Sequence, residues 1–201
     1  PGAAQRLELL LALGEAQNSA GDRDRAKETA LQAADVARRL KDSEALARAA
    51  LGFAASLGEY GAIDQQVVDL LDEALDALGD VDSAVRARVL SRLSLEFTFS
   101  GARQRAETPV RKAVEVARRV GDPKALADAL WTSCIVFAGP DDVEERLLIS
   151  AEVLGLAEKA RDPKMAQWGH SLRLGAQLEL GDIPAVDREI EDYQVEPRRF
   201  F

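Results

Sequence analysis

The sequence predicts an all-α protein made of repeated helical hairpins, and three observations support that prediction. Apolar residues, mostly alanine and leucine, make up 47 % of the 201 residues, while aromatic residues make up only 5 %. The clusters of Val, Ile, Thr and Tyr that mark strands are missing. Gly21, Gly101 and Gly181 lie 80 residues apart, twice over. A fixed spacing of this kind indicates a repeat architecture.

Residues 10–33 contain the hairpin that is repeated. The first helix presents Leu10, Leu13, Gly14 and Gln17 on one face, and after Gly21 the second helix presents Ala26, Ala30 and Ala33. Eighty residues later the matching positions hold Leu90, Leu93, Phe97, Gly101, Ala106, Val110 and Ala113. Gly61 and Gly139 lie about midway between successive glycines of that series, so the basic unit is about 40 residues long.

Ten helices follow from these signals, over residues 4–20, 22–40, 43–57, 64–78, 82–99, 102–120, 123–138, 141–160, 163–180 and 183–194. Glycines that can end a helix in the left-handed conformation are Gly21, Gly79, Gly101, Gly121 and Gly181. Aspartates that can cap the next helix are Asp22, Asp42, Asp122, Asp162 and Asp182. Pro109 falls inside the sixth helix, where we expect a kink or a restart.

Basic residues gather in the last turns of several helices. The pairs are Arg38 with Arg39 and Arg118 with Arg119. Positive charge in a last turn suits the helix dipole, which is the simpler interpretation. The alternative is that these pairs form a binding patch.

The hairpin of residues 10–33 resembles the tetratricopeptide repeat (TPR). The shared pattern is Leu-x-x-Leu-Gly-x-x-Gln followed by Gly21 and three alanines. Leu10, Gln17 and Ala30 stand where that family has aromatic residues, and Phe97 keeps one aromatic in the third hairpin. HEAT-type repeats have a similar length, but the spacing favours TPR. The resemblance implies one domain over residues 1–201, a right-handed α-solenoid of about five TPR-like hairpins.

A second resemblance covers nearly the whole chain. Residues 49–53, 67–75, 83–90, 116–122, 140–147 and 178–183 are similar to the helical region of large ATP-binding LuxR-type (STAND/MalT-like) transcriptional regulators. In that family an ATPase module comes before the TPR-like region and a DNA-binding helix-turn-helix follows it. The resemblance implies a sensing segment of a larger regulator, without the catalytic and DNA-binding parts.

Charge and cysteine content narrow the range of partners. Thirty-five acidic and 26 basic residues give a formal charge of −9, which repels phosphate backbones and anionic lipid. We therefore expect no direct nucleic-acid or membrane contact.

Cys134 is the only cysteine, which fits a reducing cytoplasm. No signal peptide and no apolar run of about 18–20 residues is visible. We expect a cytoplasmic location.

The sequence contains few residues or motifs that are typical of catalytic, cofactor-binding or metal sites. It contains no phosphate-binding loop of the Gly-x-x-x-x-Gly-Lys type. His170 is the only histidine, and we expect it to be structural or on the surface. Cys134 lies in an apolar run and is interpreted as a small buried hydrophobe. The acidic pairs at 141–142 and 144–145 suit a solvated helix start, an acid–base pair being the alternative. We predict no catalytic residue, cofactor or metal, and no enzyme.

The predicted function is that of an interaction module. In a TPR stack the first helix of each hairpin lines the concave face, where a protein, a peptide or a small effector could bind. Transferring that pattern gives Glu15, Asn18, Phe53, Ser56, Arg88, Ser91, Leu95, Phe99, Ser133 and Phe137 as partner-binding candidates, with Trp168 exposed in the fifth hairpin.

Two alternatives stay open at this point. Phe53, Leu95 and Phe99 could be ordinary packing, and the chain could be a structural spacer or a self-association segment, including a homo-oligomer. Residues 197–201 could begin another helix, or their two phenylalanines could dock on a neighbouring molecule.

Overall fold

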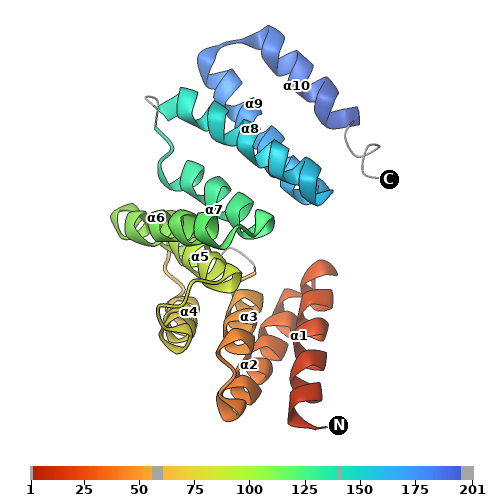
Figure 1. Cartoon of the computed structure of the whole chain (residues 1–201), viewed down its shortest axis with the longest axis vertical. Helices are drawn as coiled ribbons and strands as arrows, with labels where there is room; N and C mark the ends of the chain where they lie inside the picture. Colours follow the sequence, from red (N-terminus) through yellow and green to blue (C-terminus); the bar gives the residue numbers. More distant parts are fainter. Residues whose placement is uncertain (1, 56–60, 140–141, 196–201) are drawn as a thin grey trace.

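The computed structural model describes residues 2–55, 61–139 and 142–195. Within these ranges the chain forms ten α-helices and no strand (Figure 1). The helices are α1 (Ala3–Ser19), α2 (Arg23–Leu40), α3 (Ser43–Phe53), α4 (Gln65–Leu78), α5 (Ala84–Phe99), α6 (Arg103–Val120), α7 (Pro123–Val136), α8 (Val143–Ala160), α9 (Pro163–Leu180) and α10 (Ile183–Val195). Ser56 and residues 197–201, for which binding or docking was considered, lie outside the described residues.

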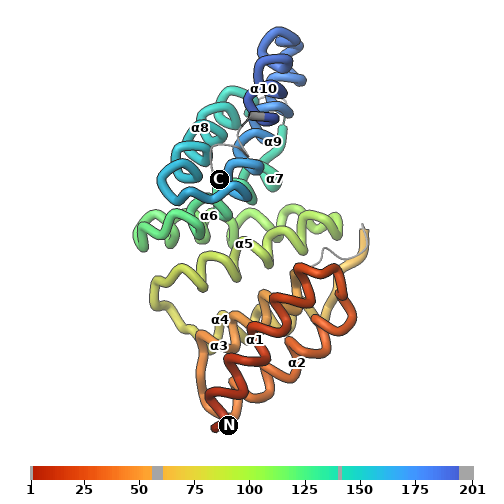
Figure 2. Tube along the Cα trace, turned by 90° about the vertical axis from the view of Figure 1, so that its right-hand side faces the viewer, coloured from red at the N-terminus to blue at the C-terminus, as the bar shows by residue number. Residues whose placement is uncertain are grey.

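The helices form an elongated stack, with α1 to α3 at one end and α8 to α10 at the other (Figures 1 and 2). Odd-numbered helices pack in series, α1 on α3, α3 on α5, α5 on α7 and α7 on α9. Each also packs on the even-numbered helix that follows it. The arrangement fits an α-solenoid in which the odd-numbered helices make one continuous layer.

Small side chains set the closeness of this packing. Ala26 and Ala33 of the first hairpin are fully buried, and so are Ala106 and Ala113 of the third, which confirms the predicted seams. The buried face of α1 differs from the prediction. Leu7, Leu11 and Gly14 are buried, at the i, i+4, i+7 spacing of one helix face, whereas Leu13 is 49 % exposed.

Most helix ends use the predicted caps. The carboxylates of Asp42, Asp122, Asp162 and Asp182 accept hydrogen bonds from amides in the first turn of the helix that follows. Asp22 makes no such bond and lies 3.5 Å from Arg25 instead. The left-handed conformation occurs at the expected Gly21, Gly101, Gly121 and Gly181, and also at Lys41 and Arg161.

The prediction of a restart at Pro109 is wrong, because α6 runs unbroken from Arg103 to Val120. Ala106, Val110 and Ala113 are fully buried on either side of the proline. Their packing holds the helix together across the hydrogen bond that Pro109 cannot donate.

One arginine of each basic pair connects two even-numbered helices. Arg38 of α2 donates to both carboxylate oxygens of Glu73 on α4, at 2.7 Å each. Arg118 of α6 makes the same two-fold contact with Glu152 of α8, at 2.9 and 3.0 Å. These bridges are exposed, so each contributes about 0–1 kcal/mol to stability. They orient the even-numbered helices rather than forming an open basic patch.

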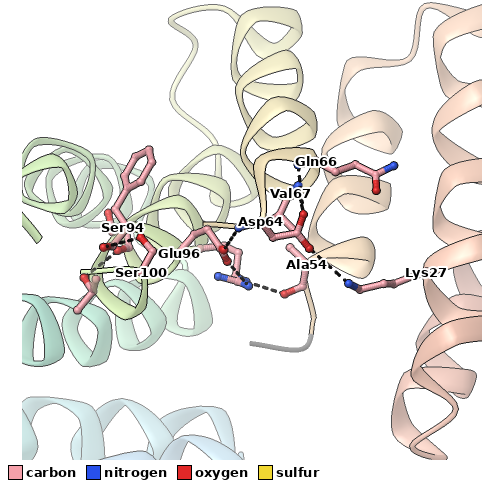
Figure 3. Close-up of polar contacts among 11 residues, drawn as sticks. Lys27, Ala54, Asp64, Gln66, Val67, Ser94, Glu96 and Ser100 are labelled. Carbon is pink, nitrogen blue, oxygen red and sulfur yellow. Dashed lines mark hydrogen bonds and ion pairs between the residues drawn. The ribbon is translucent and has the colours of Figure 1, made fainter. Parts of the chain in front are cut away.

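A buried ion pair on α5 joins the first three helices to the rest (Figure 3). Arg92 and Glu96 have side chains only 11 % and 4 % exposed and lie 3.1 Å apart. Arg92 Nε donates to the carbonyl of Ala54 at 2.6 Å, and Glu96 accepts from the amide of Asp64 at 3.0 Å. Asp64 in turn caps α4 through the amides of Gln66 and Val67. One pair therefore fixes the end of α3 and the start of α4.

This contact accounts for the largest boundary error. We expected the third helix to reach residue 57, and it ends at Phe53. The carbonyl of Ala54, just beyond that end, is bound by Arg92 from a helix about 40 residues later in the chain. No sequence pattern near Ala54 predicts that Arg92 binds its carbonyl.

Gly169 provides a test of helix packing between α8 and α9. A Cβ atom at this position would lie 2.6 Å from Leu154 Cγ and 3.2 Å from the Leu154 backbone nitrogen. Gly155 lies in α8 and has open space around the corresponding point. We predict that Gly169→Ala lowers the free energy of unfolding by about 1–3 kcal/mol through overpacking. Gly155→Ala should raise it by about 0.5–1 kcal/mol.

Chemical denaturation of both variants beside the wild type measures these changes. Equal stabilisation by both substitutions would contradict the close approach of α8 and α9.

Candidate binding surface

The open face of α7 carries a regular stripe of side chains. Lys124, Asp128, Trp131 and Ile135 follow one another at intervals of four, three and four residues, which places them on one side of the helix. Lys124 is exposed and the other three are half-buried, while their neighbours Ala127, Ala129 and Leu130 are buried. The stripe is therefore the part of α7 that the flanking helices leave uncovered.

Two tryptophans stack at the centre of this surface. The rings of Trp131 on α7 and Trp168 on α9 lie with centroids 5.6 Å apart and planes inclined by 24°. Lys164, one turn before Trp168, places its ammonium 5.6 Å from the centre of that ring. Stacked indoles offer a large, rigid apolar surface at little cost in side-chain entropy.

Charges from three helices converge beside the tryptophans. Burial raises the pKa of Asp128 to about 6, and Arg88, Lys164 and Arg92 oppose that rise. Arg88 and Arg92 belong to α5 and Lys164 to α9. A half-buried carboxyl with a strongly raised pKa is more common at functional sites than elsewhere. We call the surface of Arg88, Asp128, Trp131, Lys164 and Trp168 the tryptophan face.

A cleft of about 470 Å³ opens where the ends of α5 and α7 meet the middle of α9. It is lined by Thr98 and Phe99 of α5, Ile135 of α7, and Ser171 and Leu172 of α9, among others. Ile135 belongs both to this cleft and to the open stripe of α7. The odd-numbered helices thus carry two adjoining features, the tryptophan face and the cleft.

A second cleft, of about 410 Å³, lies between α9 and α10. Its buried polar centre is His170, whose Nδ1 lies 2.5 Å from a carboxylate oxygen of Glu189. Tyr193 meets the His170 ring edge-on at 5.6 Å, and Arg173 approaches the other oxygen of Glu189 at 3.3 Å. These contacts fasten α10 to α9, in agreement with a structural role for His170.

The predicted concave residues divide into three groups. Glu15 and Arg88 are exposed, and Phe99 lines the cleft. Phe53, Ser91 and Leu95 are buried, at 3 %, 1 % and 7 % exposure, so they cannot line an open groove. For Phe53 and Leu95 this matches the alternative of ordinary packing.

The remaining three are engaged in contacts between or within helices. The Asn18 amide donates to the carbonyl of Gly52 at 3.1 Å, joining α1 to α3. The hydroxyl of Ser133 donates to the carbonyl of Leu130, and Phe137 lies under the guanidinium of Arg111 at 4.4 Å. Neither Ser133 nor Phe137 belongs to the open stripe of α7.

The prediction named Arg88 and Trp168 of the tryptophan face and missed Trp131, because α7 was phased by offset alone. The open position is Trp131, two residues before Ser133, and two residues correspond to about 200° around a helix. The signal was present in the sequence. Charged and aromatic residues recur at four- and three-residue spacing within an alanine- and leucine-rich segment, from Lys124 to Ile135.

The described residues were searched for metal sites and membrane-spanning helices. No group of three or more His, Cys, Asp or Glu side chains there could hold a metal ion. No helix in those ranges is long and apolar enough to cross a membrane. Burial raises the pKa of the Cys134 thiol to about 12, so the sulfur stays protonated and is a poor nucleophile.

Comparisons with known proteins give no family. No protein-family model matches the chain, and neither does any curated protein.

The raised pKa of Asp128 predicts how stability changes with pH. The unfolded chain ionises this carboxyl near pH 4, whereas the folded protein does so near pH 6. Between these values the folded state holds the extra proton, so stability falls as pH rises and the loss is complete above pH 6. Asp128→Asn removes the effect. We expect the variant to match the wild type at pH 4 and to be about 1–3 kcal/mol more stable at pH 8.

Thermal unfolding at both pH values measures the difference. Asp187 on α10 is exposed, and Asp187→Asn serves as the control for the substitution itself. A gain for Asp128→Asn that is the same at pH 4 and pH 8 would rule out this assignment.

Proposed function

We propose that this chain is a non-enzymatic interaction module whose tryptophan face binds a segment of a partner protein. The observation that supports this most strongly is the stacked pair of Trp131 and Trp168, which is half-buried, with the ammonium of Lys164 over the Trp168 ring. Aromatic residues and arginine are the side chains most enriched at interaction hot spots. Only 5 % of the residues are aromatic, so the stacking of two indoles on one face supports a binding centre there.

The side chains on this face suggest the chemistry of the partner. Arg88 and Lys164 are both exposed, and both act on Asp128, whose pKa burial raises to about 6. One positive charge is left over when Asp128 is ionised. A segment with an aromatic or aliphatic side chain for the indoles and a carboxylate for Arg88 would complement the face.

The architecture supports a TPR-like, right-handed repeat as the finer description of the fold. The odd-numbered helices pack in series and the seams of small residues recur after 80 residues. In a LuxR-type regulator, as the sequence resemblance implies, such a segment would sense a partner or effector in the cytoplasm. Binding would then shift the regulator between inactive and active assemblies.

A spacer or self-association segment is the second candidate. It is favoured by the exposed apolar side chains near the C-terminal end of the stack. Leu178, Leu180 and Ile183 are between 53 % and 54 % exposed.

A peptide library displayed on phage and selected on the whole chain tests the proposed function. Selected peptides should contain an acidic residue beside an aromatic or aliphatic one. Trp168→Ala should weaken their binding by about 2 kcal/mol, roughly thirty-fold, because it removes half of the aromatic surface. Arg88→Gln should weaken the acidic peptides more at low salt than at high salt.

Tyr193→Ala is the matched control, since Tyr193 is an aromatic residue on α10 that is 43 % exposed. It should leave binding unchanged. Failure to enrich any peptide, or equal affinity for the wild type and Trp168→Ala, would refute the tryptophan face as the binding centre.

A further inference from the structure

The tryptophan face and the cleft are joined along two neighbouring helices. On α7, Ile135 of the cleft follows Trp131 by four residues. On α9, Leu172 of the cleft follows Trp168 by the same interval. Four residues are about one turn, so each cleft residue lies about 6 Å along the helix from its tryptophan and on the same side. Because the two indoles stack and both later residues line one cleft, the two features form a continuous surface.

Three helices give the cleft apolar walls. Phe99 of α5, Ile135 of α7 and Leu172 of α9 line it, and all three are half-buried. Apolar surface that is left in contact with water gains free energy when a partner covers it. A volume of about 470 Å³ is enough to admit one large side chain.

The Arg146 guanidinium on one side of the cleft is already bound. Both of its terminal nitrogens contact the carboxylate of Glu179, with Nη1 at 2.8 Å, and Nη2 donates to the carbonyl of Gly139 at 3.3 Å. Asp142 lies at the same point, because a Cβ atom on Gly139 would be only 3.0 Å from Asp142 Oδ2. The hydrogen bond to Glu179 raises the pKa of Arg146, and the charge of Asp142 adds to that rise.

The remaining charges around the cleft are compensated as well. Arg103 donates to the carbonyl of Ala138 at 2.9 Å. Burial raises the pKa of the Cys134 thiol, and the negative charge of Glu145 adds to that rise. The carboxylates around the cleft thus cancel the positive charges of Arg103 and Arg146. A cleft with balanced charges does not favour an ionised group, and its apolar walls favour an uncharged one.

We propose that the partner segment bound by the tryptophan face inserts an uncharged, apolar side chain into this cleft, against Phe99, Ile135 and Leu172. This inference rests on the proposed function and adds a second anchor to it. The cleft begins about 6 Å beyond the indoles. Two residues of an extended segment span about 6–7 Å. In an extended partner the second anchor is therefore two positions from the residue that packs on the indoles.

Gly175 allows the cleft to be filled without a change in the tryptophan face. It lines the cleft on α9, and a Cβ atom there would meet no atom within 4 Å. Gly175→Leu therefore occupies the space of the second anchor without overpacking the helix. Gly155→Leu is the matched control, because Gly155 is a glycine of α8 with equal space around it.

Selecting the phage-displayed peptide library in parallel on the wild type and on both variants tests this inference. Peptides from the wild type and from Gly155→Leu should share an acidic residue, an aromatic or aliphatic residue and a further apolar residue. Peptides from Gly175→Leu should keep the first two and lose the third. A synthetic peptide with the wild-type consensus should bind Gly175→Leu about ten- to a hundredfold more weakly, which corresponds to one large buried apolar side chain.

Substitutions in that peptide give an independent measurement on the wild-type protein. Replacing the further apolar residue by alanine should weaken binding to the wild type by a comparable factor and leave binding to Gly175→Leu unchanged. Replacing it by lysine should weaken binding to the wild type at least as much, because the charge would lose its hydration in the cleft.

Two results would overturn the second anchor while leaving the tryptophan face as the binding centre. One is the same consensus and affinity for the wild type and Gly175→Leu, and the other is equal or tighter binding of the lysine peptide. Trp168→Ala should weaken even the alanine peptide, so the two proposals fail separately. A library that enriches no peptide on the wild type would refute both.

Discussion

The buried pair of Arg92 and Glu96 is the interaction on which the rest of the arrangement depends. It lies on α5, in the middle of the stack, and binds a carbonyl beyond the end of α3 and an amide at the start of α4. Burial lowers the pKa of Arg92, and the neighbouring Glu96 carboxylate opposes that change. Removing one partner from such a pair typically costs about 3–5 kcal/mol.

The two halves of the stack on either side of this pair differ in the surfaces that they leave open. On its N-terminal side, polar residues of the odd-numbered layer serve contacts between helices, as the Asn18 amide and the Glu8–Arg48 bridge of 3.1 Å do. On its C-terminal side, α5, α7 and α9 leave the tryptophan face and the cleft open. The proposed binding surface therefore lies in the second half, although the repeat runs through both.

The sequence predicted the fold from signals that act locally. Aspartates with an amide two or three residues away, and glycines that tolerate positive φ, mark helix ends without reference to the rest of the chain. Features that depend on distant residues were missed. The end of α3 is set by Arg92, and the bridge from Arg38 to Glu73 joins helices that no local pattern relates.

The binding surface was harder to predict, because each residue advances about 100° around a helix. An error of one or two positions therefore assigns the wrong side chains to the open face. In the third hairpin, which matches the first at 80-residue spacing, Arg88 is exposed and Phe99 lines the cleft, whereas Ser91 and Leu95 are buried. For α7 no such match was used, and a shift of two residues replaced Trp131 by Ser133. Ser133 lies about 200° around α7 from Trp131 and donates its hydroxyl to the carbonyl of Leu130 in the same helix.

The central claim is that the tryptophan face is the place where a partner binds. The chain has two tryptophans, and both belong to that face, so their indole N–H resonances report on it directly. Titrating a selected peptide into isotope-labelled protein should shift both indole signals together with the amides of α5, α7 and α9. Unmoved indole signals, with shifts confined to the even-numbered helices, would contradict the account.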